Sequence, residues 1–508
     1  MSKSEGIFQV KIGAILSYIL IIANAMFGIC VTPFILKCLG ESPYGVYRTI
    51  ASLSSAVMVL DFGLGGTTMR YIAKYKADKE DDKIQPFVSM SLCEALVLVI
   101  LVALISAAVF FNIQNLYANS FHATELALAK DLFAILAITM MLQIVENVLN
   151  GIITGHNNFA LGNGIKLLRI LARIVLYVVV LPIYESAVAL VTVDLVLTLL
   201  IVVCEATYIR FGYQIKCTLN VRQWDMSVFK ESFFYSFTLF LTSIVAQINN
   251  NLDNVVIGAI KGAEYVAVYS FGLLIFGMFE QLSTSISGVM LPTVTQTLRK
   301  ENGDEKVQNL IVSVGRIQFM LLGAAVIGFA VIGKEFIELW LGKGYEDVYV
   351  ISLILMIPAL FELCVNVCLS VLRAKKMLKF RTTVLVSSTI LNLIVTILGV
   401  QFWDYKAAAI GTAISFIAGS LIIMNIYYYK KLAFNMLQMY RQIFRRIWIC
   451  IILGGGAIWV SSRLVANGWV AFVFNILVFC VVYGASLLLF GLTEQEKRNI
   501  PFFKKFMQ

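Results

Sequence analysis

Three basic residues share one face of a segment that is otherwise apolar. Lys166, Arg169 and Arg173 follow the spacing i, i+3, i+7, which puts them on a single stripe of an α-helix. If that helix starts near residue 164, Arg173 lies about 14 Å along it. Arginine binds phosphate oxygens in pairs and keeps its charge at physiological pH. The stripe therefore predicts a site for a diphosphate.

The same residues also have a purely structural interpretation. Lys166 and Arg169 are long enough to reach the aqueous interface. In the two adjoining hairpins, Glu146 falls at the depth of Arg169, and Asp194 falls within one turn of Arg173. Either carboxylate could form a static ion pair with its arginine, and the spacing does not decide between the two interpretations.

Several carboxylic acids lie inside apolar segments, Glu94 among them. The four that we single out are Asp61, Asp253, Glu280 and Glu362. A carboxyl group at membrane depth is costly and usually faces a partner or a water-filled space. Each of the four is a candidate to carry a coupling proton or to bind sodium. The alternative for each is a hydrogen bond or an ion pair between helices.

Two further segments carry polar candidates. Asn249 and Asn250 share roughly one face of segment 231–259 with Gln247 and Asp253. That face could bind sugar hydroxyls or join helices by hydrogen bonds. Arg48, at one end of segment 46–69, could contact cargo at the outer mouth or anchor the helix at the interface.

The composition indicates what must position these residues. Of 508 residues, 60% are hydrophobic and 14% are charged, with a mean hydropathy of +0.86, whereas soluble domains are about 45–50% apolar. A window of roughly 20 residues, the length that crosses a bilayer, finds about fourteen apolar segments. We therefore expect an all-α membrane protein with about 14 transmembrane helices.

The basic residues indicate the topology, because lysine and arginine gather in cytoplasmic loops. With the N-terminus inside, alternate loops are rich in them, and both termini are then cytoplasmic. Examples are Lys74, Lys76, Lys79 and Lys83, and Arg373, Lys375, Lys376, Lys379 and Arg381. The net charge of +10 is thus a topology signal, and we expect no nucleic-acid partner.

Residue patterns typical of enzymes or metal sites do not occur. The nine cysteines form no CxxC pair, and His122 and His156 lie far apart, so neither a metal nor another cofactor is predicted. The predicted loops are too short for a catalytic domain and hold no paired carboxylates or Ser/His arrangement. We predict that the chain is not an enzyme.

A weak internal repeat suggests two halves. Residues 39–47 and 260–269 each join an apolar run to a glycine-containing turn and an aromatic–small–Val–Tyr helix start. Six segments separate them, so the repeat would be parallel. The predicted division is an N-terminal six-helix lobe at 1–220, a C-terminal six-helix lobe at 221–435, and an extra helix pair with a cytoplasmic tail at 436–508.

Local motifs resemble the Wzx-type polysaccharide flippases of the multidrug/oligosaccharidyl-lipid/polysaccharide (MOP) exporter superfamily. They are Ile35–Gly40, Tyr44–Arg48, Leu60–Gly65, Arg70–Tyr75 and Asn250–Gly258. The resemblance implies two lobes around a central cavity and alternating access in the bacterial cytoplasmic membrane. It also implies a cargo, undecaprenyl-diphosphate-linked oligosaccharide. From their types and positions in the sequence, the residues expected to bind it are Arg173, Arg169, Lys166, Arg48, Asn249 and Asn250.

Two other functions remain open at this point. An ion-coupled drug or cation antiporter of the same superfamily would favour an acidic or aromatic cavity, which the basic stripe 166–173 does not suggest. A membrane-embedded polymerase or glycosyltransferase would need a large loop that carries catalytic groups. Of the three, the flippase is the function that the sequence favours.

Overall fold

The computed structural model of the chain is helical throughout its described part. It describes residues 12, 16, 19–20, 22–216, 226–288, 290–464, 468–493 and 496, without the side chains of 238, 239 and 241–250. Every regular element in these residues is an α-, 3-10 or π-helix, and none is a strand. The predicted all-α class is confirmed.

Thirteen helical segments of the described residues are long and apolar enough to cross a bilayer. They are Ile22–Leu39, Glu41–Asp78, Asp81–Tyr117, Ala123–Gly155, Phe159–Tyr184, Ala187–Gly212, Ala263–Leu298, Gly303–Leu341, Glu346–Cys364, Leu378–Phe402, Ala407–Leu432, Ile447–Leu464 and Trp469–Gly491. A further helix of 35 residues, Met226–Ile260, ends in the apolar stretch Asn251–Ile260. The chain is therefore a multi-pass membrane protein.

The chain forms two compact units, Met1–Ala267 and Val268–Gln508. The lobe limits near 220 and 435 remain predictions. The first unit contains η1 (Phe27–Val31), α2 (Thr32–Leu39), α3 (Glu41–Met58), η2 (Val59–Asp61), α4 (Leu64–Asp78), η3 (Asp81–Lys83), α5 (Ile84–Tyr117), α6 (Ala123–Gly155), α7 (Phe159–Tyr184), α8 (Ala187–Gly212) and α9 (Met226–Ile260).

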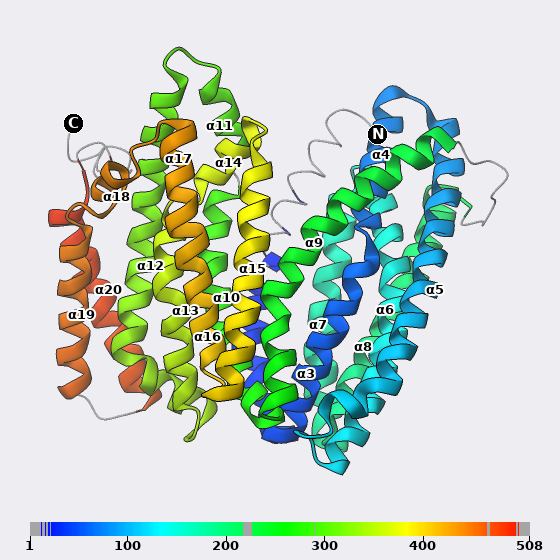
Figure 1. The fold of residues 1–508 in the computed structure, drawn as a ribbon, viewed down its shortest axis with the longest axis horizontal. Coiled ribbons are helices and arrows are strands. Elements are labelled where there is room, and N and C mark those ends of the chain that lie inside the picture. Colours follow the sequence, from blue (N-terminus) through cyan, green and yellow to red (C-terminus); the bar gives the residue numbers. More distant parts are fainter. Residues whose placement is uncertain are drawn as a thin grey trace. The chain divides into compact units, whose positions relative to one another are not determined.

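Helix α6 is the centre of the first unit, where it packs against α3, α4, α5, α7 and α8 (Figure 1). Its apolar side chains Ile144, Val148 and Ile152 are fully buried in one core cluster. Glycine allows the closest crossing. A Cβ atom added at Gly151 would lie 2.5 Å from the carbonyl oxygen of Gly65 on α4, so these helices touch through their backbones, as small residues permit in membranes.

The second span is broken in its middle. Phe62 and Gly63 both have positive φ angles, 54° and 63°, and they separate α3 and η2 from α4. A left-handed phenylalanine is strained, whereas glycine adopts this conformation readily. Interrupted membrane helices occur where surrounding protein satisfies the freed backbone groups. Asp61 ends η2 at this break.

The two turns of the sequence repeat meet in the first unit. A Cβ atom added at Gly45 would lie 1.9 Å from the carbonyl oxygen of Ala263. On the preceding helix, a Cβ atom at Gly258 of α9 would lie 2.6 Å from Cγ2 of Thr49 on α3. Glycine at these two positions lets the end of α9 and the start of α10 lie directly against α3.

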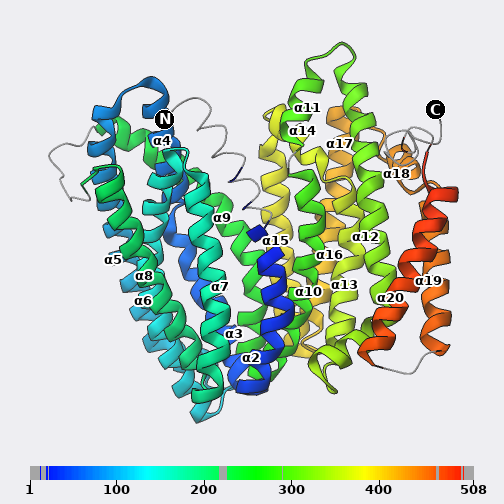
Figure 2. The same cartoon turned by 180° about the vertical axis from the view of Figure 1, so that it is seen from behind.

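The second unit contains most of α10 (Ala263–Ser287), then α11 (Leu291–Leu298), α12 (Gly303–Leu341), α13 (Glu346–Cys364), α14 (Val367–Ala374), α15 (Leu378–Phe402), α16 (Ala407–Ser415), η5 (Phe416–Ile423), α17 (Met424–Leu432), α18 (Met436–Phe444), α19 (Ile447–Leu464), α20 (Trp469–Ser486) and η6 (Leu487–Gly491). Helices α19 and α20 lie beside α12 in both views (Figures 1 and 2). Ile332, Cys450, Ile458, Phe479 and Tyr483 form the core of that contact.

Candidate functional site

Helix α7 holds the basic stripe, and its first turn is anchored on both sides. The side chain of Asn158 caps the helix by accepting a hydrogen bond from the backbone N–H of Leu161. The amide of Asn158 donates to the hydroxyls of Tyr208 and Tyr213, at the end of α8. This cap therefore sets the position of α7 against α8, and with it the register of Arg169 and Arg173.

Arg173 is paired with an acid from the neighbouring helix. Its Nε lies 2.7 Å from Oδ1 of Asp194 on α8, and the two side chains are 29% and 16% exposed. The guanidinium carbon also lies 5.9 Å from the centre of the Phe27 ring. The ion pair that the sequence left open is present, and it is only partly covered.

Arg169 is held more firmly. Its Nη1 donates to Oε1 of Glu146 on α6 over 2.9 Å, and its Nη2 donates to the hydroxyl of Thr198 on α8. Thr198 in turn donates to the backbone carbonyl of Asp194. Arg169 therefore links α6, α7 and α8 and connects both ion pairs. Lys166, one turn earlier, is exposed.

Glu205 extends this arrangement, although the sequence analysis did not select it. It is 1% exposed on α8, and its Oε1 accepts a hydrogen bond from the amide of Asn150 on α6 over 3.1 Å. The signal was available, because Glu205 follows Asp194 by 11 residues, about three helical turns, and so lies on the same face of α8. We call Glu146, Asn150, Arg169, Arg173, Asp194, Thr198 and Glu205 the charged network.

The charges of the network nearly cancel. Arg169 pairs with Glu146 and Arg173 pairs with Asp194, and Glu205 lies near enough to Arg169 to be influenced by its charge. Oε2 of Glu146 and Oε2 of Glu205 are buried and accept no hydrogen bond from the described residues. The positive charge of the basic stripe is therefore balanced by nearby carboxylates. Some oxygens of these carboxylates are still free to accept hydrogen bonds from cargo or water.

Two candidates from the second span lie in different surroundings. Arg48 on α3 is half-buried, and its Nε has no hydrogen-bond partner among the described residues. The neighbouring Tyr47 lies close enough to Arg173 and Asp194 to be influenced by their charges. Asp61, about 20 Å further along the span, accepts a hydrogen bond from Asn147 of α6 at Oδ2 over 3.2 Å. Tyr47 thus lies near the network, whereas Asp61 marks the helix break.

The polar face of the seventh span is described only in part. Asn249 and Asn250 lie in α9, but their side chains are outside the described residues. Asp253 is 4% exposed, and the adjacent Asn254 donates to the hydroxyl of Ser52 on α3 over 3.0 Å. In the described stretch, at least Asn254 therefore joins helices rather than lining open space.

The two acidic candidates of the second unit come together. Glu280 on α10 and Glu362 on α13 are close enough for the charge of one to act on the other. Glu362 also lines a cavity of about 30 Å³ with Asn366, Arg381 and Ser420. That volume holds one or two water molecules. From the sequence, Arg381 counts among the basic residues of a cytoplasmic loop, so its place in this lining was not foreseen.

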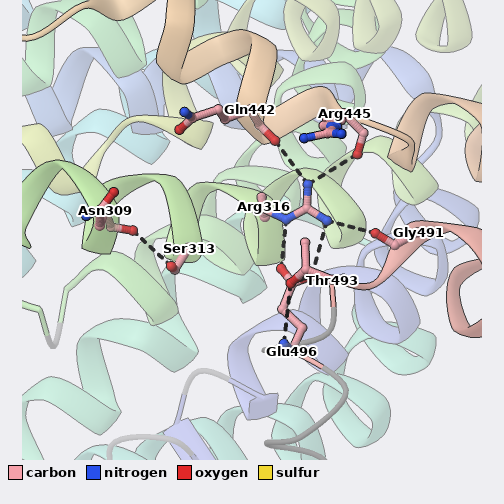
Figure 3. A network of polar contacts seen from close by, with 8 residues as sticks. All are labelled: Asn309, Ser313, Arg316, Gln442, Arg445, Gly491, Thr493 and Glu496. Atoms are coloured by element: carbon pink, nitrogen blue, oxygen red, sulfur yellow. Dashed lines mark hydrogen bonds and ion pairs between the residues drawn. The ribbon is translucent and has the colours of Figure 1, made fainter.

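One intramembrane arginine has a structural role instead. Arg316 on α12 is 5% exposed and makes five hydrogen bonds (Figure 3). Its Nε and Nη2 donate to the carboxylate of Glu496, at 2.7 and 3.2 Å, and its other donors reach the backbone carbonyls of Gln442, Arg445 and Gly491. All of these partners belong to the C-terminal segment that carries α19 and α20.

The Glu496 carboxylate is stabilised in its charged form. Burial would raise its pKa, but hydrogen bonds from Arg316 and from Thr493 outweigh burial and hold the pKa below its usual value. No group of three or more His, Cys, Asp or Glu side chains arranged to hold a metal ion occurs in the described part of the chain.

Comparison with known proteins identifies the family of this chain. The family model for "Polysaccharide biosynthesis protein" matches residues 39–350, more than half of the chain. The chain belongs to this family. A Salmonella typhi protein named "Putative O-antigen transporter" is 23% identical over 324 residues, which cover 62% of this chain and 71% of that protein.

Solved structures show the same fold. The lipid II flippase MurJ in an inward closed conformation matches with a TM-score of 0.70 and 16% identity, over 98% of this chain and 99% of MurJ. An inward-facing multidrug resistance MATE transporter of the MOP superfamily matches with a TM-score of 0.61 and 17% identity, over 81% and 96%. The resemblance seen in the sequence is confirmed, and the relatives are transporters and flippases rather than enzymes.

Proposed function

We propose that this family member is a flippase that carries undecaprenyl-diphosphate-linked oligosaccharide from the inner to the outer leaflet of the bacterial cytoplasmic membrane by alternating access. The family match and the O-antigen transporter relative support a saccharide cargo. The observation that carries the proposal is the charged network on α6, α7 and α8, with permanent cations at membrane depth.

The ion pairs are compatible with binding of a diphosphate. An unpaired buried charge is costly, so an arginine that binds cargo needs a counter-ion while no cargo is bound. Asp194 supplies one to Arg173, and the pair is 29% and 16% exposed rather than sealed. An incoming diphosphate competes with Asp194 for Arg173. Lys166, which is exposed on the same stripe, attracts the diphosphate as it approaches Arg173.

Displacement of a carboxylate offers a physical basis for ion coupling. When a diphosphate takes Arg173, Asp194 loses its counter-ion, and binding a proton removes the cost of the stranded charge. The spare oxygens of Glu146 and Glu205 are further places for a proton. Asp61, Asp253, Glu280 and Glu362 remain candidates for the same role, with a proton or sodium as the ion.

The test is a charge-pair experiment in proteoliposomes that contain fluorescent lipid-linked oligosaccharide. Arg173→Gln should abolish flipping, and the double variant Arg173→Gln/Asp194→Asn, which leaves no stranded charge, should restore protein abundance but not flipping. If the double variant flips at the wild-type rate, Arg173 serves only to neutralise Asp194 and the assignment is wrong. Dissipating the proton and sodium gradients tests the coupling separately.

A second candidate function, an ion-coupled drug or cation antiporter, is favoured by one observation. Three carboxylates against two arginines in the network would also suit a cationic cargo. In that case Glu205→Gln should abolish export of organic cations while leaving flipping of the lipid-linked oligosaccharide intact. The antiporter would be excluded if the wild-type protein transports no organic cation and Glu205→Gln loses flipping of the lipid-linked oligosaccharide.

A further inference from the structure

A cavity in the first unit lies apart from the charged network. It has a volume of about 370 Å³ and is formed by the start of α4, the middle of α5 and the first half of α9. Its lining consists of Phe62, Leu64, Glu94, Val97, Leu98, Leu101, Phe229, Phe233 and Ser236. An engineered cavity of about 150 Å³ holds a benzene molecule, so this space is large enough for a substantial apolar group.

The break in the second span shapes one wall of the cavity. At the break, Phe62 turns toward α9, where its ring stacks on Phe240 with 4.1 Å between centroids and 2° between planes. Phe233, which also lines the cavity, lies 6.4 Å from Phe62. Ser236 also lines the cavity, and its hydroxyl is hydrogen-bonded to that of Thr67 over 2.7 Å. This polar group of the lining therefore already has a partner.

The front of the cavity opens sideways, into the apolar layer of the membrane. Val97, Leu101 and Phe233 line the cavity and are 63%, 37% and 47% exposed, so the cavity is open where these apolar side chains lie. Residues 94–101 lie near the centre of the 34-residue helix α5, and therefore near mid-bilayer. Only a molecule that already lies in the membrane reaches an opening at this depth.

The dimensions favour a branched hydrocarbon chain. Along α5 the lining runs from Glu94 to Leu101, a distance of roughly 10 Å. The volume divided by this length gives a mean cross-section of roughly 37 Å², which is wider than one straight methylene chain needs. Methyl branches at regular intervals, as in a polyprenyl chain, would fill that width.

We infer that this cavity is a binding site for the polyprenyl tail of the carrier lipid, entered from the membrane between α5 and α9. The inference rests on the proposed function for the choice of carrier, and it adds a second contact region to the cargo. The head group would lie with the charged network, while part of the tail is held by apolar side chains of the same unit. A phospholipid acyl chain is the competing occupant.

The test uses undecaprenyl phosphate with a diazirine in its prenyl chain, added to the full-length protein in phosphatidylglycerol-containing nanodiscs. After illumination, we expect cross-links within 94–101 and 229–236, and protection by unlabelled undecaprenyl phosphate but not by added phosphatidylglycerol. Equal protection by the phospholipid, or cross-links that map elsewhere, would overturn the inference.

Matched variants on α5 make the test specific. Leu98→Trp fills the cavity, whereas Leu104→Trp puts the same ring on a residue that is 64% exposed and does not line it. We expect cross-linking to fall about tenfold in Leu98→Trp, equivalent to losing roughly two buried methylenes, and to stay unchanged in Leu104→Trp. Because Leu98 packs on the core, Val97→Trp at the open mouth provides a second plug. Unchanged labelling in both plugged variants would refute the inference.

A variant of Glu94 distinguishes a hydrocarbon tail from a lipophilic amine as the occupant of the cavity. Its Oε1 is buried without a hydrogen-bond partner among the described residues, so the cavity could attract a lipophilic amine instead. A hydrocarbon tail should bind Glu94→Gln as it binds wild type. Protection by an amine that is lost in Glu94→Gln would overturn the inference.

Flipping without cross-links in the cavity refutes the tail site alone, whereas cross-links in the cavity without flipping support the tail site and refute the proposed function.

Discussion

Arg316→Ala removes the guanidinium that fastens the last two helices to α12. The variant leaves the Glu496 carboxylate and three backbone carbonyls without the donor that they share (Figure 3). The side chains of Arg316 and Glu496 are only 7% and 22% exposed. Loss of one partner from such a buried pair costs about 3–5 kcal/mol.

This cost should appear as exposure of a buried thiol. Cys450 is fully buried on α19, and its Sγ lies 3.3 Å from the carbonyl oxygen of Ser486 on α20. If the anchored segment must detach before a maleimide reaches Cys450, a loss of 3–5 kcal/mol speeds labelling by roughly 10²- to 10³-fold or more. The measurement is the labelling rate in a variant that keeps Cys450 as its single cysteine.

Two controls make the result interpretable. Lys375→Ala breaks an ion pair with Asp304 that is 27% and 60% exposed, worth about 0–1 kcal/mol, so it should leave the rate nearly unchanged. A single cysteine at position 480, which is already exposed, should react at the same rate with and without Arg316. If Arg316→Ala changes the Cys450 rate no more than Lys375→Ala does, the C-terminal helices are held by apolar packing, and our reasoning about Arg316 is wrong.

Three further outcomes are expected. Because the folded-state pKa of Glu496 is below its ordinary value of 4.5, its contribution is present above about pH 4.5 and is lost as the pH falls toward the lowered pKa. The melting temperature of wild type should therefore exceed that of Glu496→Gln at pH 7 and approach it in acid; a constant difference would contradict this. Gly151→Leu should greatly reduce the yield of monodisperse protein, because even a Cβ would meet the backbone of Gly65 at 2.5 Å. As a control, a Cβ atom at Gly164 would meet nothing within 4 Å, so Gly164→Ala should leave the free energy of unfolding unchanged or raise it by up to about 1 kcal/mol. Gly258→Val should separate α9 from α3 and slow flipping, and normal rates would mean that the contact with Thr49 is not needed during transport.

The composition and order of the sequence determined the class of fold. Apolar runs of roughly 20 residues have no stable alternative to membrane helices, because backbone polar groups in lipid must bond within their own segment. The short motifs around Tyr44–Arg48 and Leu60–Gly65 then indicated a family concerned with polysaccharides, and the family match shows that the chain belongs to the polysaccharide biosynthesis protein family. These properties depend on local sequence and were readable without any contact between helices.

Which charges meet was decided by the tertiary structure. The sequence placed Arg169 and Arg173 on one stripe and named Glu146 and Asp194 as possible partners, but depth along a span does not determine how each helix is rotated toward its neighbours. Close packing, such as that of Gly151 on Gly65 of α4, contributes to that rotation, and only the folded structure shows that Glu205 accepts a hydrogen bond from Asn150. The same ambiguity left the role of Arg316 open, because an arginine within an apolar run looks the same in sequence whether it faces cargo or pairs with a carboxylate 180 residues later.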